Sequence, residues 1–264
     1  TGVTWEIGQS QHMALMALMQ RGALREVTTR AQRYEREALE RGDLYGWTHI
    51  LTVGGFMTPL VADRPSEARD LVSQAMARWP RDSFHLQHFF ELMALVQIDL
   101  YAGDGLALAR LDAAWPELTR SMLMRVQFIG ATASWMLGVA LLSAHTAEPS
   151  QHPDALKRVR ALAVEIGRTD IAHRMVFVRL LEAQVALVQG NRERARVLAS
   201  EAHSVVEHFD LGLFAARTQY LCGVLTPGDT GIKMKESALA SLRAEGVVVP
   251  MRYVFQALPV LRRL

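Results

Sequence analysis

Apolar residues recur along this chain at helical spacing, in two alternating patterns. Four segments carry them three and four positions apart on a charged background: Leu24, Val27, Ala31, Tyr34 and Ala38; Ala68, Leu71, Val72, Ala75 and Trp79; Leu108, Leu111, Trp115 and Leu118; Ala195, Leu198, Ala199, Ala202, Val206 and Phe209. Five other segments, at about 45–60, 84–101, 122–144, 171–189 and 211–225, are apolar nearly all round. A striped helix covers one side of a core, whereas a uniformly apolar helix is covered on most sides. The sequence therefore predicts an all-α fold of alternating outer and inner helices.

The turns before the inner helices recur at a regular interval. Asp43 and Asp82 lie 39 positions apart, and Asp170 and Asp210 lie 40 positions apart. Aspartate is a favoured N-cap because its carboxylate accepts hydrogen bonds from the first helical turn. We therefore expect each of these four residues to open an inner helix.

An interval of about forty residues is typical of helical-repeat proteins, which stack hairpins into a superhelix. The tetratricopeptide pattern of small residues is clearest around Gly190. We predict that residues 1–264 form one tetratricopeptide-like α-solenoid of about six helical hairpins plus a short C-terminal helix. It has an insertion loop at about 145–154 and a terminal capping region at about 230–264. Such a stack leaves one long concave face.

Composition excludes several classes of protein. The net charge is +2, from 29 Lys and Arg against 27 Asp and Glu, with no basic block, so no nucleic-acid partner is expected. The one cysteine, Cys222, excludes an internal disulfide and predicts a cytoplasmic protein. Leu44–Ala62 and Val126–His145 lack charges, but polar and small residues interrupt both, so no membrane span is expected. The chain begins with Thr1, so we expect a segment of a longer protein.

Candidate chemistry centres on His85 and His88, which lie three positions apart, with Glu91 a turn further. This trio could ligate a metal. Zinc-binding helices more often use a spacing of four with a distant third ligand, and Phe84 and its neighbours indicate a packing environment. Phosphate-binding glycine loops are absent, and Cys222 lies in an apolar stretch typical of a buried thiol. We therefore expect no catalytic, cofactor-binding or metal-binding residues.

Polar and aromatic side chains on the inner helices are the candidates for a partner surface. Those without an evident structural role are Trp47, His49, His85, His88, Arg125, Gln127, Arg174 and Arg179. Methionines indicate either a versatile peptide groove or flexible core filling, and core filling is the preferred interpretation. These are Met13, Met16, Met19, Met122, Met124 and Met136.

Several segments resemble one family of signalling proteins. They are TWEIGQSQ near the start, REVTTRAQRYEREALERGDLYGWTHI, FHLQHFFELMALVQIDLYAGDGLALARLDAAWPELTRSMLMRVQF and the closing SLRAEGVVVPMRYVFQALP. They are similar to the C-terminal region of large bacterial, myxobacterial-type serine/threonine protein kinases. In that family a kinase domain is followed by a P-loop ATPase module and a tetratricopeptide-like array. The resemblance implies that the catalytic and ATP-binding residues lie upstream of this chain.

Two functions follow as expectations. The first is a non-catalytic regulatory and protein-interaction region of a serine/threonine kinase, whose partner is the upstream kinase and ATPase domains or another protein or peptide. The alternative is the effector-binding solenoid of an ATPase-type transcription regulator, with a small molecule held between repeats. Such regulators end in a DNA-binding helix-turn-helix, a motif that this sequence lacks. A stand-alone enzyme is not expected, because no catalytic motif is present.

Overall fold

Helices joined by short turns account for most of the chain. The computed structural model describes residues 2–264, and no β-strand occurs among them, which confirms the predicted all-α class. The helices are α1 (Gly2–Gln20), α2 (Leu24–Glu40), α3 (Leu44–Ile50), α4 (Met57–Val61), α5 (Pro65–Met76), α6 (Leu86–Ala102), α7 (Leu106–Arg120), α8 (Gln127–Ala147), α9 (Ala155–Gly167), α10 (Arg174–Val188), α11 (Arg192–His208), α12 (Gly212–Leu225), α13 (Gly228–Ala244) and α14 (Pro250–Ala257). A π-helical turn (Leu51–Gly55) joins α3 to α4, and 3₁₀ turns occupy Met122–Arg125 and Pro259–Arg263.

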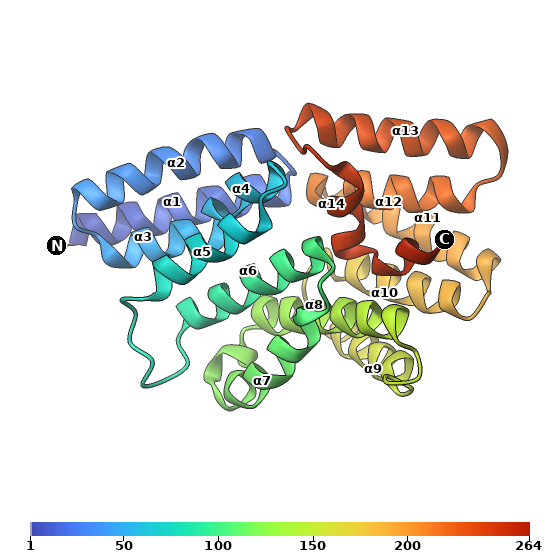
Figure 1. Ribbon diagram of the computed structural model, residues 1–264, viewed down its shortest axis with the longest axis horizontal. Coiled ribbons are helices and arrows are strands. Elements are labelled where there is room, and N and C mark those ends of the chain that lie inside the picture. The colour runs from blue at the N-terminus through green and yellow to red at the C-terminus, as the bar shows by residue number, and fades with distance from the viewer. Residues whose placement is uncertain (1) are drawn as a thin grey trace.

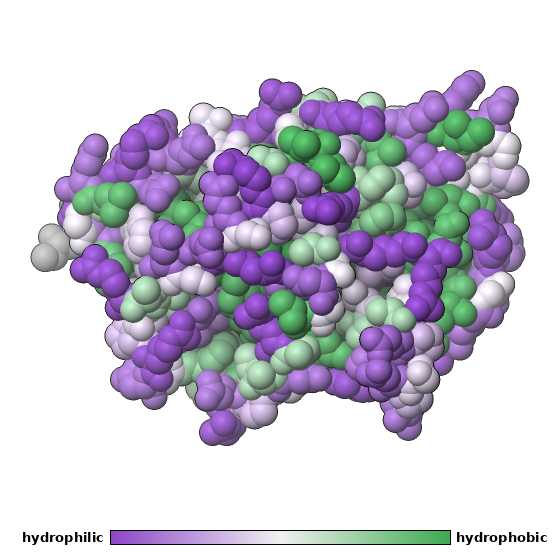
Figure 2. Space-filling model, in the orientation of Figure 1, coloured by the Kyte–Doolittle hydropathy of each residue, from purple (hydrophilic) through white to green (hydrophobic). Residues whose placement is uncertain are grey.

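The predicted alternation of outer and inner helices is present in the structure. On α2 the buried side chains are the five of the predicted stripe, spaced three and four apart from Leu24 to Ala38. In contrast, α6, α8 and α10 are buried on most sides. Each of these inner helices packs against an outer one on either side in sequence, as Figure 1 shows for α10 between α9 and α11. Hydrophilic side chains dominate the face seen in Figure 2, with apolar ones scattered between them.

The predicted aspartate caps are correct at one position of four. The Asp43 carboxylate accepts a hydrogen bond from the Gly46 backbone at 2.9 Å and opens α3. Asp82, Asp170 and Asp210 do not cap a helix, because each inner helix begins two to four residues after its aspartate. The residues at the N-cap positions are His85 for α6, His173 for α10 and Leu211 for α12. The turns before α6, α10 and α12 are therefore longer than the spacing of the aspartates predicts. In one of them, the Asp210 backbone adopts a left-handed φ of 51°.

The C-terminal segment (residues 250–263) crosses the inner side of the molecule, where it contacts the inner helices α6, α8, α10 and α12. Helix α13 pairs with α12, and α14 then turns back to contact α6 and α12 (Figure 1). The following 3₁₀ turn contacts α8 and α10. Side-chain amides fix the crossing: Gln256 donates to the Gln97 carbonyl at 2.9 Å, and Gln184 donates to the Ala257 carbonyl at 3.2 Å. The inner side of the helices is therefore covered in part by the chain's own C-terminal segment.

The first and last hairpins meet, so the helices form a closed ring. Helix α1 contacts α12, and the backbones of Gly22 and Gly212 approach so closely that a side chain on either would clash. Nearby, the Arg25 backbone N–H donates to the Glu245 carboxylate at 3.2 Å. Val248 also donates to the Val61 carbonyl at 2.9 Å. These contacts join residues about 190 to 220 positions apart and hold the ring shut.

One helix among residues 2–264, α8, has the length and apolar character needed to cross a bilayer. Most of it is buried against the neighbouring helices. Its interior position accounts for its apolar sequence, since α8 contacts α6, α7, α9 and α10.

Candidate functional site

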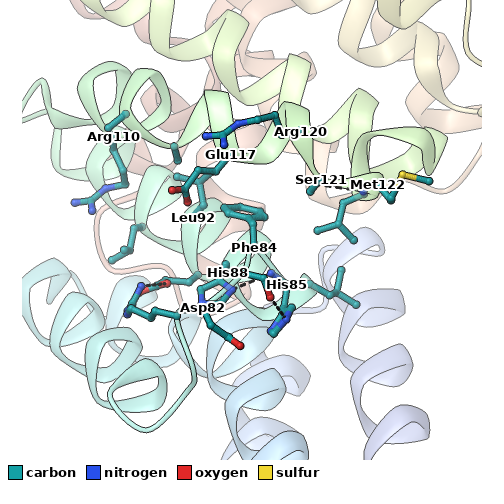
Figure 3. A pocket seen from close by; sticks show the side chains of 18 of the residues that line it. Asp82, Phe84, His85, His88, Leu92, Arg110, Glu117, Arg120, Ser121 and Met122 are labelled. Carbon is teal, nitrogen blue, oxygen red and sulfur yellow. Dashed lines mark hydrogen bonds and ion pairs between the residues drawn. The ribbon is translucent and has the colours of Figure 1, made fainter.

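A groove of about 1320 Å³ lies between α7 and the α5–α6 connection (residues 77–85). The connection is extended because α5 ends at Met76 and Pro80 disfavours continued helix. Its opposite wall is the outward side of α7, where the small side chains of Ala109 and Ala113 leave space. Figure 3 shows the labelled side chains that surround this hollow, named here the α7 groove.

The connection side of the α7 groove carries His85 and His88, two of the predicted interaction residues. The Nδ1 atom of His88 accepts a hydrogen bond from the His85 backbone at 2.9 Å, so this imidazole caps the start of α6. Burial lowers the pKa of His88, which is therefore neutral near pH 7. The His85 ring lies 2.5 Å from the Ser83 hydroxyl and is half-exposed. His85 therefore remains accessible to a partner, whereas His88 has a structural role.

Charged side chains frame the groove on both sides. Arg81 pairs with Glu91 at 3.0 Å on the connection side. On α7, Arg110 reaches the buried Asp99 at 2.8 Å, while Glu117 and Arg120 are exposed. The groove thus combines apolar and small side chains with charges of both signs, which suits a polypeptide more than a single ion.

The metal interpretation of His85, His88 and Glu91 finds no support in the geometry. The Nδ1 atom of His88 accepts a backbone hydrogen bond, and the Glu91 carboxylate is paired with Arg81. Across residues 2–264, no group of three or more His, Cys, Asp or Glu side chains is arranged to hold a metal ion. Cys222 is buried, and burial raises its pKa to about 11, so this thiol is not a nucleophile near neutral pH.

The other predicted interaction residues are dispersed through the fold. Trp47 and His49 lie on α3, where His49 is buried between His12, Tyr45 and Phe90. Both His49 ring nitrogens and the Trp47 indole nitrogen are buried without a hydrogen-bond partner among the described residues. These two side chains contribute to the core of the first hairpins.

Four predicted residues lie near α8 and α10. Arg125 is exposed in the 3₁₀ turn before α8. The Gln127 side chain accepts from the Asp170 backbone at 2.6 Å, and Arg174 donates to the Gly167 and Ile171 carbonyls, so both fix the α9–α10 turn. Arg179 pairs with Glu182 and Glu201 and links α10 to α11. Of the eight predicted residues, His85 and His88 are the two that line the α7 groove.

Sequence reasoning missed two features of the interior. Arg217 on α12 is buried and holds the C-terminal segment, but nothing distinguishes it in the sequence from surface arginines. An apolar cavity also lies among the inner helices, lined in part by Met16, Met19 and Met136. The clustering of methionines was its sequence signal, and core filling was the interpretation preferred there.

Comparisons with protein-family models, with curated proteins and with solved structures gave no match to this chain.

Proposed function

We propose that this chain is a non-catalytic, tetratricopeptide-like interaction region of a bacterial serine/threonine protein kinase signalling protein, which acts in the cytoplasm. Its antiparallel helix pairs and alternating inner and outer helices support the helical-repeat part of the proposal. The segments that resemble the C-terminal arrays of such kinases support the signalling part. In this proposal the kinase and ATPase domains lie elsewhere in the parent protein, and those domains bind ATP.

The α7 groove is the observation that carries the proposal. The volume of the α7 groove, about 1320 Å³, exceeds that of a typical small-molecule pocket, and the groove is open along one side of α7. Small side chains at Ala109 and Ala113 allow a partner backbone to approach α7 closely. The exposed Leu106 offers an apolar contact at one end, and Glu117 and Arg120 offer polar contacts at the other. The partner is a polypeptide segment of the kinase or ATPase domains, or of another protein.

A second candidate function has its own supporting observation. The cavity among the inner helices supports the effector-binding alternative, in which the solenoid of an ATPase-type transcription regulator holds a small molecule. Both functions use the same ring of helices, but at different places.

Substitution of a small groove residue tests the first proposal. Ala113→Trp places a bulky side chain in the α7 groove and keeps a helix-compatible residue at an exposed position, so the fold is retained. This change is expected to weaken the docking of the chain on the proposed kinase domain at least tenfold, measured by titration of the separately produced chain and kinase domain. Ala161→Trp, on the exposed side of α9, is the matched control and leaves docking unchanged. Equal effects of the two substitutions, or none from either, would exclude the α7 groove as the docking site.

A further inference from the structure

An apolar cavity that is partly open to solvent lies among the inner helices, separate from the α7 groove. Its volume is about 110 Å³, and α1, the π turn, α6, α8, α10 and α12 all contribute to its wall. Six segments that are distant in sequence therefore converge on one space.

The cavity has an aromatic floor and a more flexible rim. Trp135, Phe177 and Phe214 are buried and contact one another, with the rings of Trp135 and Phe177 stacked at 5.2 Å. Met16 and Met136 belong to the rim and remain partly exposed. Methionine side chains adapt their shape at low cost, so this rim can admit a small molecule and close over it.

Two polar atoms of residues that line the cavity have no hydrogen-bond partner among the described residues. The Gln20 side-chain oxygen and the Thr132 hydroxyl are buried, and neither makes a hydrogen bond within residues 2–264. The neighbouring Thr52 hydroxyl donates to the Thr48 carbonyl at 2.8 Å, and the Gln97 amide donates to the Met93 carbonyl at 3.2 Å. A buried polar atom left unpaired costs about 1–3 kcal/mol. Neither atom has accessible surface on the cavity in this conformation, so a ligand hydroxyl reaches them through a shift of the methionine rim.

An unusual backbone conformation, the π turn, also lies beside the cavity. The π turn contributes Thr52 and Val53 to the wall, and π turns within helices are frequent at functional sites. On α6 the lining residues run from Phe89 to Gln97, and the Gln97 carbonyl accepts a hydrogen bond from Gln256 of the C-terminal segment. The C-terminal segment thus adjoins the cavity and restrains its wall.

We propose that this cavity binds a small aromatic molecule with one hydroxyl group, of the phenol class. An apolar cavity of about 150 Å³ binds benzene in a protein interior, so at about 110 Å³ this cavity holds an aromatic ring only when the methionine rim moves outward. The aromatic ring stacks against the floor of Trp135 and Phe177. Its hydroxyl donates to the Gln20 oxygen or accepts from the Thr132 hydroxyl. This inference rests on the effector-binding candidate function and does not involve the α7 groove, so its failure leaves the docking proposal in place.

Calorimetric titration of the 264-residue chain with phenol and with benzene tests the site. Phenol is expected to bind saturably, and about 2- to 10-fold more tightly than benzene, since only phenol satisfies the unpaired polar atoms. Thr132→Val preserves the shape of the side chain and removes its hydroxyl. It is expected to reduce the affinity for phenol by about 2- to 10-fold without weakening benzene.

A pair of substitutions on α1 locates the binding. Met16→Trp places a larger side chain at the rim and is expected to abolish binding of both molecules. Met13→Trp changes an exposed residue of the same helix and leaves binding unchanged, and circular dichroism checks that both variants fold. Three results would overturn the proposal: no saturable binding by the wild-type chain, equal affinities for phenol and benzene, or unchanged binding by a folded Met16→Trp variant. If Met16→Trp does not fold, the affinities of Thr132→Val for phenol and benzene still test the proposal.

Discussion

The guanidinium carbon of Arg217 on α12 lies 4.1 Å from the ring centre of Tyr253 on α14, and both side chains are buried. The Arg217 side chain also donates to the Tyr253 carbonyl at 3.2 Å and to the Gln256 side-chain oxygen at 2.5 Å. Within residues 2–264 no carboxylate pairs with it, and burial lowers its pKa. The cation is held by an aromatic face and neutral oxygens, and it fastens the C-terminal segment across the ring.

Replacement of this arginine tests that role. Arg217→Met keeps most of the side-chain volume but removes the hydrogen bonds to Tyr253 and Gln256. We expect the free energy of unfolding to fall by about 1–3 kcal/mol, because buried acceptors lose their donor. Urea denaturation measures this change. Hydrogen exchange should quicken mainly in residues 250–263, and uniform acceleration over the whole chain would contradict a local fastening.

Ring closure depends on the absence of a side chain at Gly212. A methyl group there would lie 1.9 Å from the Arg21 carbonyl oxygen, so Gly212→Ala must push α1 and α12 apart. We expect a loss of about 1–3 kcal/mol in the free energy of unfolding. Gly167→Ala is the matched control, because the nearest atom to its added methyl is 3.9 Å away and alanine favours helix. A control as destabilising as Gly212→Ala would mean that the close approach is not the cause.

Asp99 joins three helices through a buried carboxylate. It pairs with Arg69 of α5 at 2.9 Å and with Arg110 of α7 at 2.8 Å, and its side chain is fully buried on α6. Asp99→Asn removes the charge that both guanidinium groups face and should lower the free energy of unfolding by about 1.5–3 kcal/mol. Asp112→Asn, at an exposed pair with Arg158, should cost less than about 1 kcal/mol. Chemical denaturation of the two variants side by side would reveal any departure from this order.

Stability should decrease in acid because of two buried histidines. Burial lowers the pKa of His49 to about 3 and that of His12 to about 4, from an ordinary value of 6.5. Below pH 6.5 the unfolded chain binds protons that the folded chain does not. The free energy of unfolding therefore keeps its maximal value above pH 6.5 and decreases as the pH falls toward 4. Each histidine contributes at most about 1.4 kcal/mol per pH unit.

His49→Phe separates this effect from general acid instability. The ring fits between Tyr45 and Phe90, and no hydrogen bond is lost, because neither nitrogen of His49 has a partner among the described residues. The difference in unfolding free energy between pH 7.5 and pH 5 should shrink in this variant. His208→Phe, at an exposed position on α11, should leave the difference as in the wild type. An unchanged difference in His49→Phe would show that His49 is protonated in the folded state.

Local features of the fold could be predicted from the sequence, and long-range ones could not. The apolar spacing from Leu24 to Ala38 predicts the buried face of α2, because helical geometry alone determines which side chains share a face. The Asp43 cap was also predictable from its neighbours. Asp82 failed as a cap because His85 and His88 satisfy the start of α6 instead, a pairing that only the folded backbone specifies.

In the candidate sites, too, local features could be predicted from the sequence and long-range ones could not. His85 and His88 were found because both their residue type and their spacing are unusual, and they do line the α7 groove. The groove itself depends on how far the α5–α6 connection departs from α7, which composition does not encode. The return of the C-terminal segment joins Arg217 to Tyr253 across 36 positions, through backbone carbonyls that every residue possesses. Contacts of that kind leave no sequence pattern.

Hydrogen exchange at the α7 groove tests the proposed docking function most directly. The isolated chain and the full-length protein are compared amide by amide, with the Ala113→Trp variant measured in both forms. We predict slower exchange in the full-length protein at residues 81–88 and 106–123, and loss of that protection in Ala113→Trp. Identical exchange of these residues in the isolated chain and in the full-length protein, with and without added kinase substrates, would contradict docking at the α7 groove.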